Sequence, residues 1–141
     1  MHSAERYPFL SIASALGEAG FQPRLPLTLA YHDQSVAVSG VLDTGAMVNV
    51  LPYTVGVDLG AIWAQHTITL QLTGNLAQFD ARVLVVSATV GSFAPVRLVF
   101  AWTQAPHVPV LLGQVNFFME FDACFYRSQL AFELRPKGAA G

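Results

Sequence analysis

The sequence predicts a single all-β domain, built as a barrel or a sandwich. Its 141 residues match the usual size of one domain, and 53% of them are hydrophobic, which argues against disorder. Glycine and proline recur at short intervals, and the apolar segments between them are short and rich in β-branched residues. This punctuation favours short strands joined by turns over long helices.

The first half of the chain contains three short apolar segments with the character of strands. These strands are expected at residues 25–31, 36–43 and 48–51, with a turn at 32–35 between the first two. A short helix is expected over residues 52–59. Proline is tolerated in a first helical turn, and Gly60 suits the position after a helix end.

The second half continues the same pattern. Residues 67–72 alternate between polar and apolar side chains, as a half-buried strand does, and a turn at Gly74-Asn75 leads into a returning strand at 79–86. Further strands are expected at 96–102 and 110–112, followed by a hairpin of residues 123–126 and 130–134. Residues 116–121 are too short and too apolar to be assigned by their pattern.

The charge content limits the classes of partner. Charged residues make up 11% of the chain, against about 25% in ordinary domains, which suggests that a partner covers part of the surface. The net charge is −2, and the seven basic residues form no stripe, so neither nucleic acid nor an anionic membrane is expected as a partner. No apolar run reaches the ~18 residues of a membrane helix.

Cys124 is the only cysteine, so an internal disulfide and a cysteine-based zinc site are both excluded. Such usage fits a reducing compartment, and a cytoplasmic location is expected. Cys124 lies among apolar and aromatic residues, which predicts a small core side chain. The four histidines lack metal-ligand spacing, and no metal site is expected.

The sequence patterns at the two ends of the chain are weaker than those of the middle, and they set the expected boundaries of the domain. Residues 1–22 are expected to form an N-terminal arm, mobile or loosely helical, residues 23–135 the domain, and residues 136–141 a tail. The alternative for the arm is a signal peptide with a cleavage site at Ala13-Ser14-Ala15, although its apolar run is shorter than usual.

The segment Val41-Leu42-Asp43-Thr44-Gly45-Ala46 carries the strongest chemical signal. Aspartate and glycine are depleted in strands, so their place between apolar residues needs a reason. A surface turn would explain them, with Asp43 bonding its own backbone and Gly45 adopting a positive φ. The apolar residues on both sides instead place the turn between buried segments.

With its flanks, this segment resembles the active-site loop of the retropepsin-like aspartic proteases. Val110-Leu111-Leu112-Gly113 is similar to the segment that crosses beside that loop, residues 116–121 resemble the following helix, and residues 130–134 resemble the closing strand. The resemblance spans residues 25–134. It implies a retropepsin-like closed acid-protease barrel with one or two short helices.

The resemblance also implies a role for individual residues. Asp43 would be the catalytic carboxylate, Thr44 would brace the loops across a subunit boundary, and Gly45 would let the substrate backbone approach. Ala46 would pack beneath the substrate. Leu111, Leu112 and Gly113 would support the loop.

The resemblance also implies a flap hairpin at residues 72–79 that would cover the substrate, with Thr73, Gly74, Asn75 and Leu76 in contact with it. This segment has one glycine, and the alternative is an ordinary hairpin connection.

Peptide hydrolysis of this kind needs two carboxylates that share a proton, and the chain has one Asp-Thr-Gly. A two-fold homodimer would supply the second Asp43. The resemblance therefore implies an aspartic endopeptidase that acts on extended peptides without a cofactor. Met47 and Gln114 stand where viral relatives carry a pair of opposite charges. The alternatives are a catalytically inactive dimerisation or peptide-binding module, and a fragment of a longer membrane-anchored or processed protein.

Overall fold

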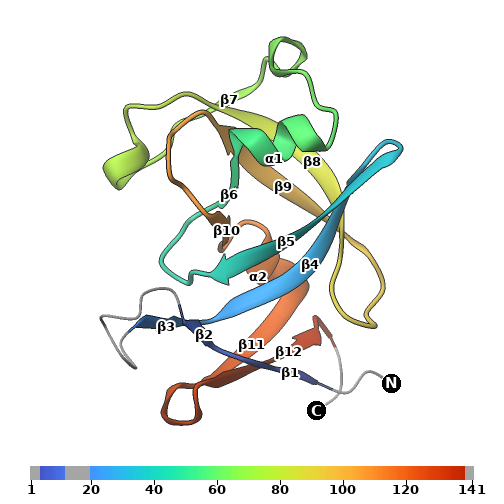
Figure 1. The fold of residues 1–141 in the computed structure, drawn as a ribbon, viewed down its shortest axis with the longest axis vertical. Helices are drawn as coiled ribbons and strands as arrows, with labels where there is room; N and C mark the ends of the chain where they lie inside the picture. The colour runs from blue at the N-terminus through green and yellow to red at the C-terminus, as the bar shows by residue number, and fades with distance from the viewer. Residues whose placement is uncertain (1–3, 12–19, 139–141) are drawn as a thin grey trace.

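The computed structural model describes residues 4–11 and 20–138, and in this part of the chain six strands of a seven-stranded sheet close into a barrel (Figure 1). In order around the barrel, the strands are β4 (Arg24–Tyr31), β5 (Gln34–Leu42), β10 (Val110–Leu112), β6 (Asn49–Pro52), β9 (Val96–Thr103) and β8 (Ala81–Thr89). One half of β8 pairs with β4 and closes the ring, while the other half pairs with β7 (Thr69–Leu70). The all-β prediction and the expected closed barrel are confirmed.

The short strand β10 lies between β5 and β6, although it follows them by more than fifty residues. It runs parallel to β5, with Leu112 beside Leu42, and antiparallel to β6, with Leu111 beside Val50. The end of β5 and the end of β10 therefore meet at one point of the barrel. Asp43 and Gly113 are the first residues after these two strands.

A second sheet lies at one end of the molecule, in the order β1 (Glu5–Pro8), β12 (Ala131–Pro136) and β11 (Phe121–Tyr126) (Figure 1). Its inner face carries Phe121, Phe132 and Leu134, which belong to the same apolar cluster as the barrel interior. The two sheets therefore share one core. A separate pair of short strands, β2 (Leu10–Ser11) and β3 (Phe21–Gln22), lies nearby.

Helices are short in the described residues. They are α1 (Tyr53–Asp58), α2 (Phe117–Glu120) and the 3₁₀ turns η2 (Trp63–Gln65), η3 (Gly74–Leu76) and η4 (Arg127–Gln129). Pro52 precedes α1, and Gly60 has a φ of +83°, as the sequence predicts for the helix end. Gly56 is buried within α1 because the Trp102 indole lies directly against it. None of the helices that the structure describes is long and apolar enough to cross a membrane.

Two predictions made from local sequence are wrong. Glu5–Pro8 is not loosely helical but forms a strand, because β12 offers it a pairing edge. Cys124 is exposed, since strand alternation turns Phe121 inward and places Cys124 on the opposite face of β11. The proposed cleavage site at residues 13–15 lies outside the described residues.

Candidate active site

The Asp43 loop is a tight turn at the end of β5, held by its own backbone. The Asp43 N–H donates to the carbonyl of Leu112 at 2.9 Å, and the Ala46 N–H donates to the carbonyl of Asp43 at 3.0 Å. The Gly45 N–H donates to Oδ1 of Asp43 at 3.0 Å, so the carboxylate is oriented by the turn. No other residue that the structure describes hydrogen-bonds to this carboxylate. Asp43 is half-buried, and its second oxygen remains available to a water or a ligand.

The segment after β10 holds the loop from the other side. The Gln114 N–H donates to the carbonyl of Ala46 at 2.9 Å, and the Gln114 side-chain amide donates to the carbonyl of Thr44 at 2.8 Å. The Val115 N–H donates to the carbonyl of Met47 at 2.9 Å. Gln114 therefore braces the loop with its backbone N–H and a neutral side-chain amide.

Glycine is required at position 113 because the backbone of the segment after β10 comes very close to the backbone of residues 46–48. A Cβ atom at this position would lie 2.6 Å from the carbonyl oxygen of Val48 and 2.7 Å from that of Ala46. Both atoms belong to the backbone and cannot rotate away. Leu111 pairs with Val41 and Val50, and Leu112 pairs with Leu42, so both lie in the sheet next to the loop.

Asn49 is a residue of this site that the sequence did not single out. Its side chain is fully buried; Oδ1 accepts the Gly113 N–H at 2.8 Å, and the amide donates to the carbonyl of Val99 at 3.0 Å and to Oδ1 of Asn116 at 3.1 Å. Asn116 also accepts the Val99 N–H and donates to the carbonyl of Arg97. Two asparagines therefore connect β6, β9 and the segment after β10. An asparagine beginning an apolar strand is the only local signal of this role.

An apolar cavity of about 180 Å³ lies beside the Asp43 loop. It brings together four residues expected at the site from distant parts of the chain, namely Ala46, Thr73, Leu76 and Leu111. Its remaining wall is formed by Met47, Val48, Val50, Gln71 and Leu72. The cavity is lined mainly by carbon, so it suits an apolar side chain of a bound molecule.

The candidate flap differs in form from the predicted hairpin. Residues 72–79 do not pair as strands; β7 is only two residues long, and η3 forms the tip of the connection to β8. The Gln71 amide closes the segment by donating to the carbonyl of Ala77 at 2.9 Å. Gly74 has a φ of +63° with no heavy atom near its missing Cβ, and neither Gly74 nor Asn75 lines the cavity. The tip therefore projects into open space while Thr73 and Leu76 face the Asp43 side.

Comparisons with known proteins support the fold. No protein-family model matches the chain, and no curated protein matches it. Among solved structures, the chain is similar to a retropepsin-like aspartic protease from Rickettsia conorii, with 16% identity and a TM-score of 0.63 over 94% of this chain and 91% of that one. It is more weakly similar to EIAV protease complexed with the inhibitor HBY-793, with 18% identity and a TM-score of 0.47 over 66% of this chain and 82% of that one. At such identities the likeness shows the fold.

Proposed function

We propose that this chain, whose fold is retropepsin-like, is an aspartic endopeptidase in which Asp43 from two copies forms the catalytic pair. The observation that carries the proposal is the placement of Asp43. Its carboxylate is oriented by Gly45, its loop is braced by Gln114, and an apolar cavity opens beside it. Such a site combines a reactive carboxylate with a wall that can hold a substrate side chain.

The chemistry requires two protonation states in one pair. One carboxylate accepts a proton from water as the water attacks the peptide carbonyl, and the other, as a carboxylic acid, donates a proton. Two like charges at short distance cannot both ionise easily, so the pair shares a proton and titrates in two separate steps. The chain has one Asp-Thr-Gly, and no second described carboxylate hydrogen-bonds to Asp43. A second copy of the chain is therefore the proposed source.

The substrate is proposed to be an extended peptide with an apolar side chain next to the cleaved bond. The cavity walls from Val48, Val50 and Leu111 support an apolar preference, and Thr73 and Leu76 would cover the bound peptide from the opposite side. Replacing Leu111 with a charged residue would remove that preference. No cofactor takes part in the proposed reaction.

The first test is the Asp43→Asn variant against a peptide library. Asparagine keeps the size and most of the hydrogen bonding of aspartate but cannot titrate, so we expect cleavage to be lost while the fold is retained. Wild-type cleavage should follow a bell-shaped pH profile with its optimum on the acidic side of neutrality. Asp58→Asn, which changes an exposed carboxylate of α1, is the matched control and should cleave normally.

Two outcomes would contradict the proposal. Cleavage by Asp43→Asn at near the wild-type rate, in a preparation free of other proteases, would remove Asp43 from the mechanism. Wild-type protein that binds extended peptides without cleaving them would favour the inactive peptide-binding module instead. The observation that favours this second function is that residues 72–79 do not form a paired flap hairpin.

A further inference from the structure

The chain has three methionines, and the two that the structure describes are both exposed. The side chain of Met47 is 66% exposed, and that of Met119 is 59% exposed. Methionine more commonly fills gaps in an apolar core, where other side chains shield its sulfur. A thioether on the surface is open to oxidants, which convert it into a polar sulfoxide. The two side chains share this chemistry, so their positions decide what oxidation does.

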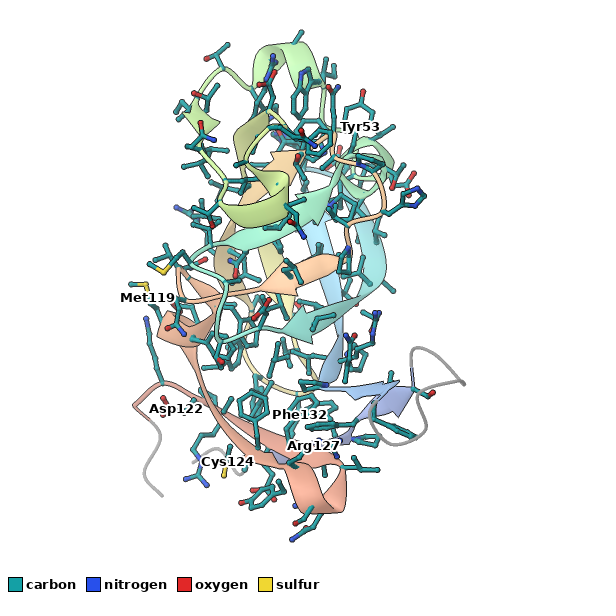
Figure 2. All side chains as sticks on the ribbon, turned by 90° about the vertical axis from the view of Figure 1, so that its left-hand side faces the viewer. Tyr53, Met119, Asp122, Cys124, Arg127 and Phe132 are labelled. Atoms are coloured by element: carbon teal, nitrogen blue, oxygen red, sulfur yellow. The ribbon has the colours of Figure 1, made fainter. Side chains whose placement is uncertain are left out.

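One of these two methionines lies at the candidate active site. Met47 forms part of the wall of the cavity beside the Asp43 loop, together with Val48 and Val50. Met119 belongs to α2, does not line that cavity, and projects from the margin of the molecule (Figure 2). Oxidation of Met47 therefore changes the cavity wall, whereas oxidation of Met119 leaves it as it is.

The backbone of Met47 is fixed, while its side chain takes no part in the core. Its carbonyl accepts the Val115 N–H at 2.9 Å, and the carbonyl of the preceding Ala46 accepts the Gln114 N–H at 2.9 Å. Met47 belongs to neither of the two apolar clusters of the described residues. An oxygen atom added to its sulfur would therefore leave the loop in place and alter only the surface that a bound side chain meets.

A sulfoxide oxygen needs a hydrogen-bond donor, and the cavity offers few. The Gln71 amide is already engaged, because it donates to the carbonyls of Leu72 and Ala77. The other donor among the lining side chains is the Thr73 hydroxyl. A sulfoxide that holds a water, or that bonds to Thr73, occupies space that a substrate side chain would fill. An apolar side chain that displaces this partner leaves the oxygen unsatisfied, at a cost in binding free energy.

We propose that Met47 is a reversible oxidation site that switches this cavity from apolar to polar side chains. The inference rests on the proposed function, because that function assigns the cavity to a side chain of the substrate. In the modifying step, the thioether sulfur attacks one oxygen of hydrogen peroxide; the S–O bond forms, the O–O bond breaks and water leaves. The sulfur loses two electrons, and the peroxide gains them. Two thiols reverse the step, giving the thioether, a disulfide and water.

The test compares peptides that carry either leucine or asparagine at an apolar position. The two side chains have nearly the same shape, and only asparagine can donate to a sulfoxide. The parent peptide is the library member that the full-length protein cleaves best or, without cleavage, binds best by fluorescence anisotropy, and each apolar residue is exchanged in turn. All proteins carry Cys124→Ala, which removes an exposed thiol that peroxide would also oxidise. Mass spectrometry quantifies the sulfoxide of Met47 and of Met119 separately.

Peroxide treatment that oxidises Met47 should raise KM, or the dissociation constant, of the leucine peptide at least about fivefold. The value of kcat should stay nearly unchanged, because the lost interaction is one of binding. The preference for leucine over asparagine should narrow or reverse. Methionine sulfoxide reductase should restore the original KM. Met47→Leu should have the same KM before and after peroxide, whereas Met119→Leu, the matched control, should respond as the parent protein does.

The outcomes separate the inference from the proposed function. Met47 that resists peroxide, or that becomes a sulfoxide while KM is unchanged, would overturn the inference and leave the endopeptidase standing. An equal rise of KM in Met47→Leu would assign the effect to another residue and also overturn it. Loss of leucine-peptide binding on oxidation, in a protein that cleaves nothing, would support the switch and reject the endopeptidase. Failure to bind or cleave any peptide would overturn both.

Discussion

At the scale of single residues, Asn49 determines the geometry of the candidate site without taking part in chemistry. Its buried side chain holds the Gly113 N–H at the point where the Asp43 loop and the segment after β10 approach most closely. A buried backbone donor without a partner loses the hydrogen bond it would make to water. The loop around Asp43 therefore depends on an amide contributed by a neighbouring strand.

We predict that Asn49→Ala lowers the free energy of unfolding by about 2–3 kcal/mol, because it leaves the Gly113 N–H unsatisfied and removes the link to Asn116. Denaturant unfolding measures this change. Asn75→Ala is the matched control, since Asn75 is exposed in η3 and its replacement should change stability by less than about 0.5 kcal/mol. Equal effects of the two variants would show that the Asn49 hydrogen bonds add no stability.

At the scale of elements, the segment around η3 has far fewer contacts with the barrel than the strands β5 and β6 have with their neighbours. The segment around η3 is joined to the barrel through the short strand β7 and the Gln71 amide, and residues 73–75 are exposed. β5 and β6, by contrast, pair with neighbours on both sides. Segments with few buried contacts open at the lowest free-energy cost.

We expect amide hydrogens of residues 72–79 to exchange faster than those of β5 and β6, because this segment lacks strand pairing. Hydrogen exchange followed by mass spectrometry measures the difference. A bound extended peptide should slow exchange in residues 72–79 if this segment covers the substrate. Protection equal to that of β5 in the free protein would argue against a role in opening and closing.

The attachment of β1 should depend on pH through Glu5. Hydrogen bonds from the Ser92 hydroxyl, the Tyr7 hydroxyl and the Ser92 N–H hold the pKa of this carboxyl below its ordinary value of 4.5, although burial acts in the opposite direction. A lowered pKa means that the ionised form is favoured in the folded state. Its contribution to stability is therefore present above pH 4.5 and is lost as the pH falls through the lowered pKa.

Glu5→Gln removes this titration while keeping the shape of the side chain. We predict a lower melting temperature for the variant than for the wild type at pH 6, and a difference that shrinks as the pH is lowered below 4.5. Asp33→Asn, an exposed carboxylate in the turn between β4 and β5, is the control. A constant difference between wild type and Glu5→Gln across this range would mean that the charge of Glu5 does not stabilise β1.

At the scale of the whole molecule, one chain provides half of the proposed site. In the described residues, the barrel places the Asp43 loop beside an apolar cavity lined by Ala46, Met47 and Val48. Charged residues make up 11% of the sequence, and large apolar side chains are exposed beside the loop. Activity should therefore depend on association of two chains.

We predict that the Asp43→Asn variant inhibits the wild-type protein when the two are mixed and allowed to exchange. With nine parts of variant to one part of wild type, random pairing leaves about one wild-type subunit in ten with a wild-type partner. Activity per wild-type subunit should then fall roughly tenfold. Asp58→Asn added in the same excess should not inhibit. Undiminished activity in the presence of Asp43→Asn would show that one chain is sufficient for cleavage.

The sequence by itself determined the all-β class, the positions of most barrel strands and the Asp43 loop, since alternation, turn residues and helix ends are local properties. Only the tertiary structure decided that β10 lies between β5 and β6, that Asn49 holds Gly113, and that Thr73 and Leu76 share a cavity with Ala46. It also turned Cys124 outward and gave Glu5–Pro8 a partner strand. Strand pairing and buried hydrogen bonds join residues distant in sequence, so their energies depend on how the chain closes and leave no pattern in any single segment.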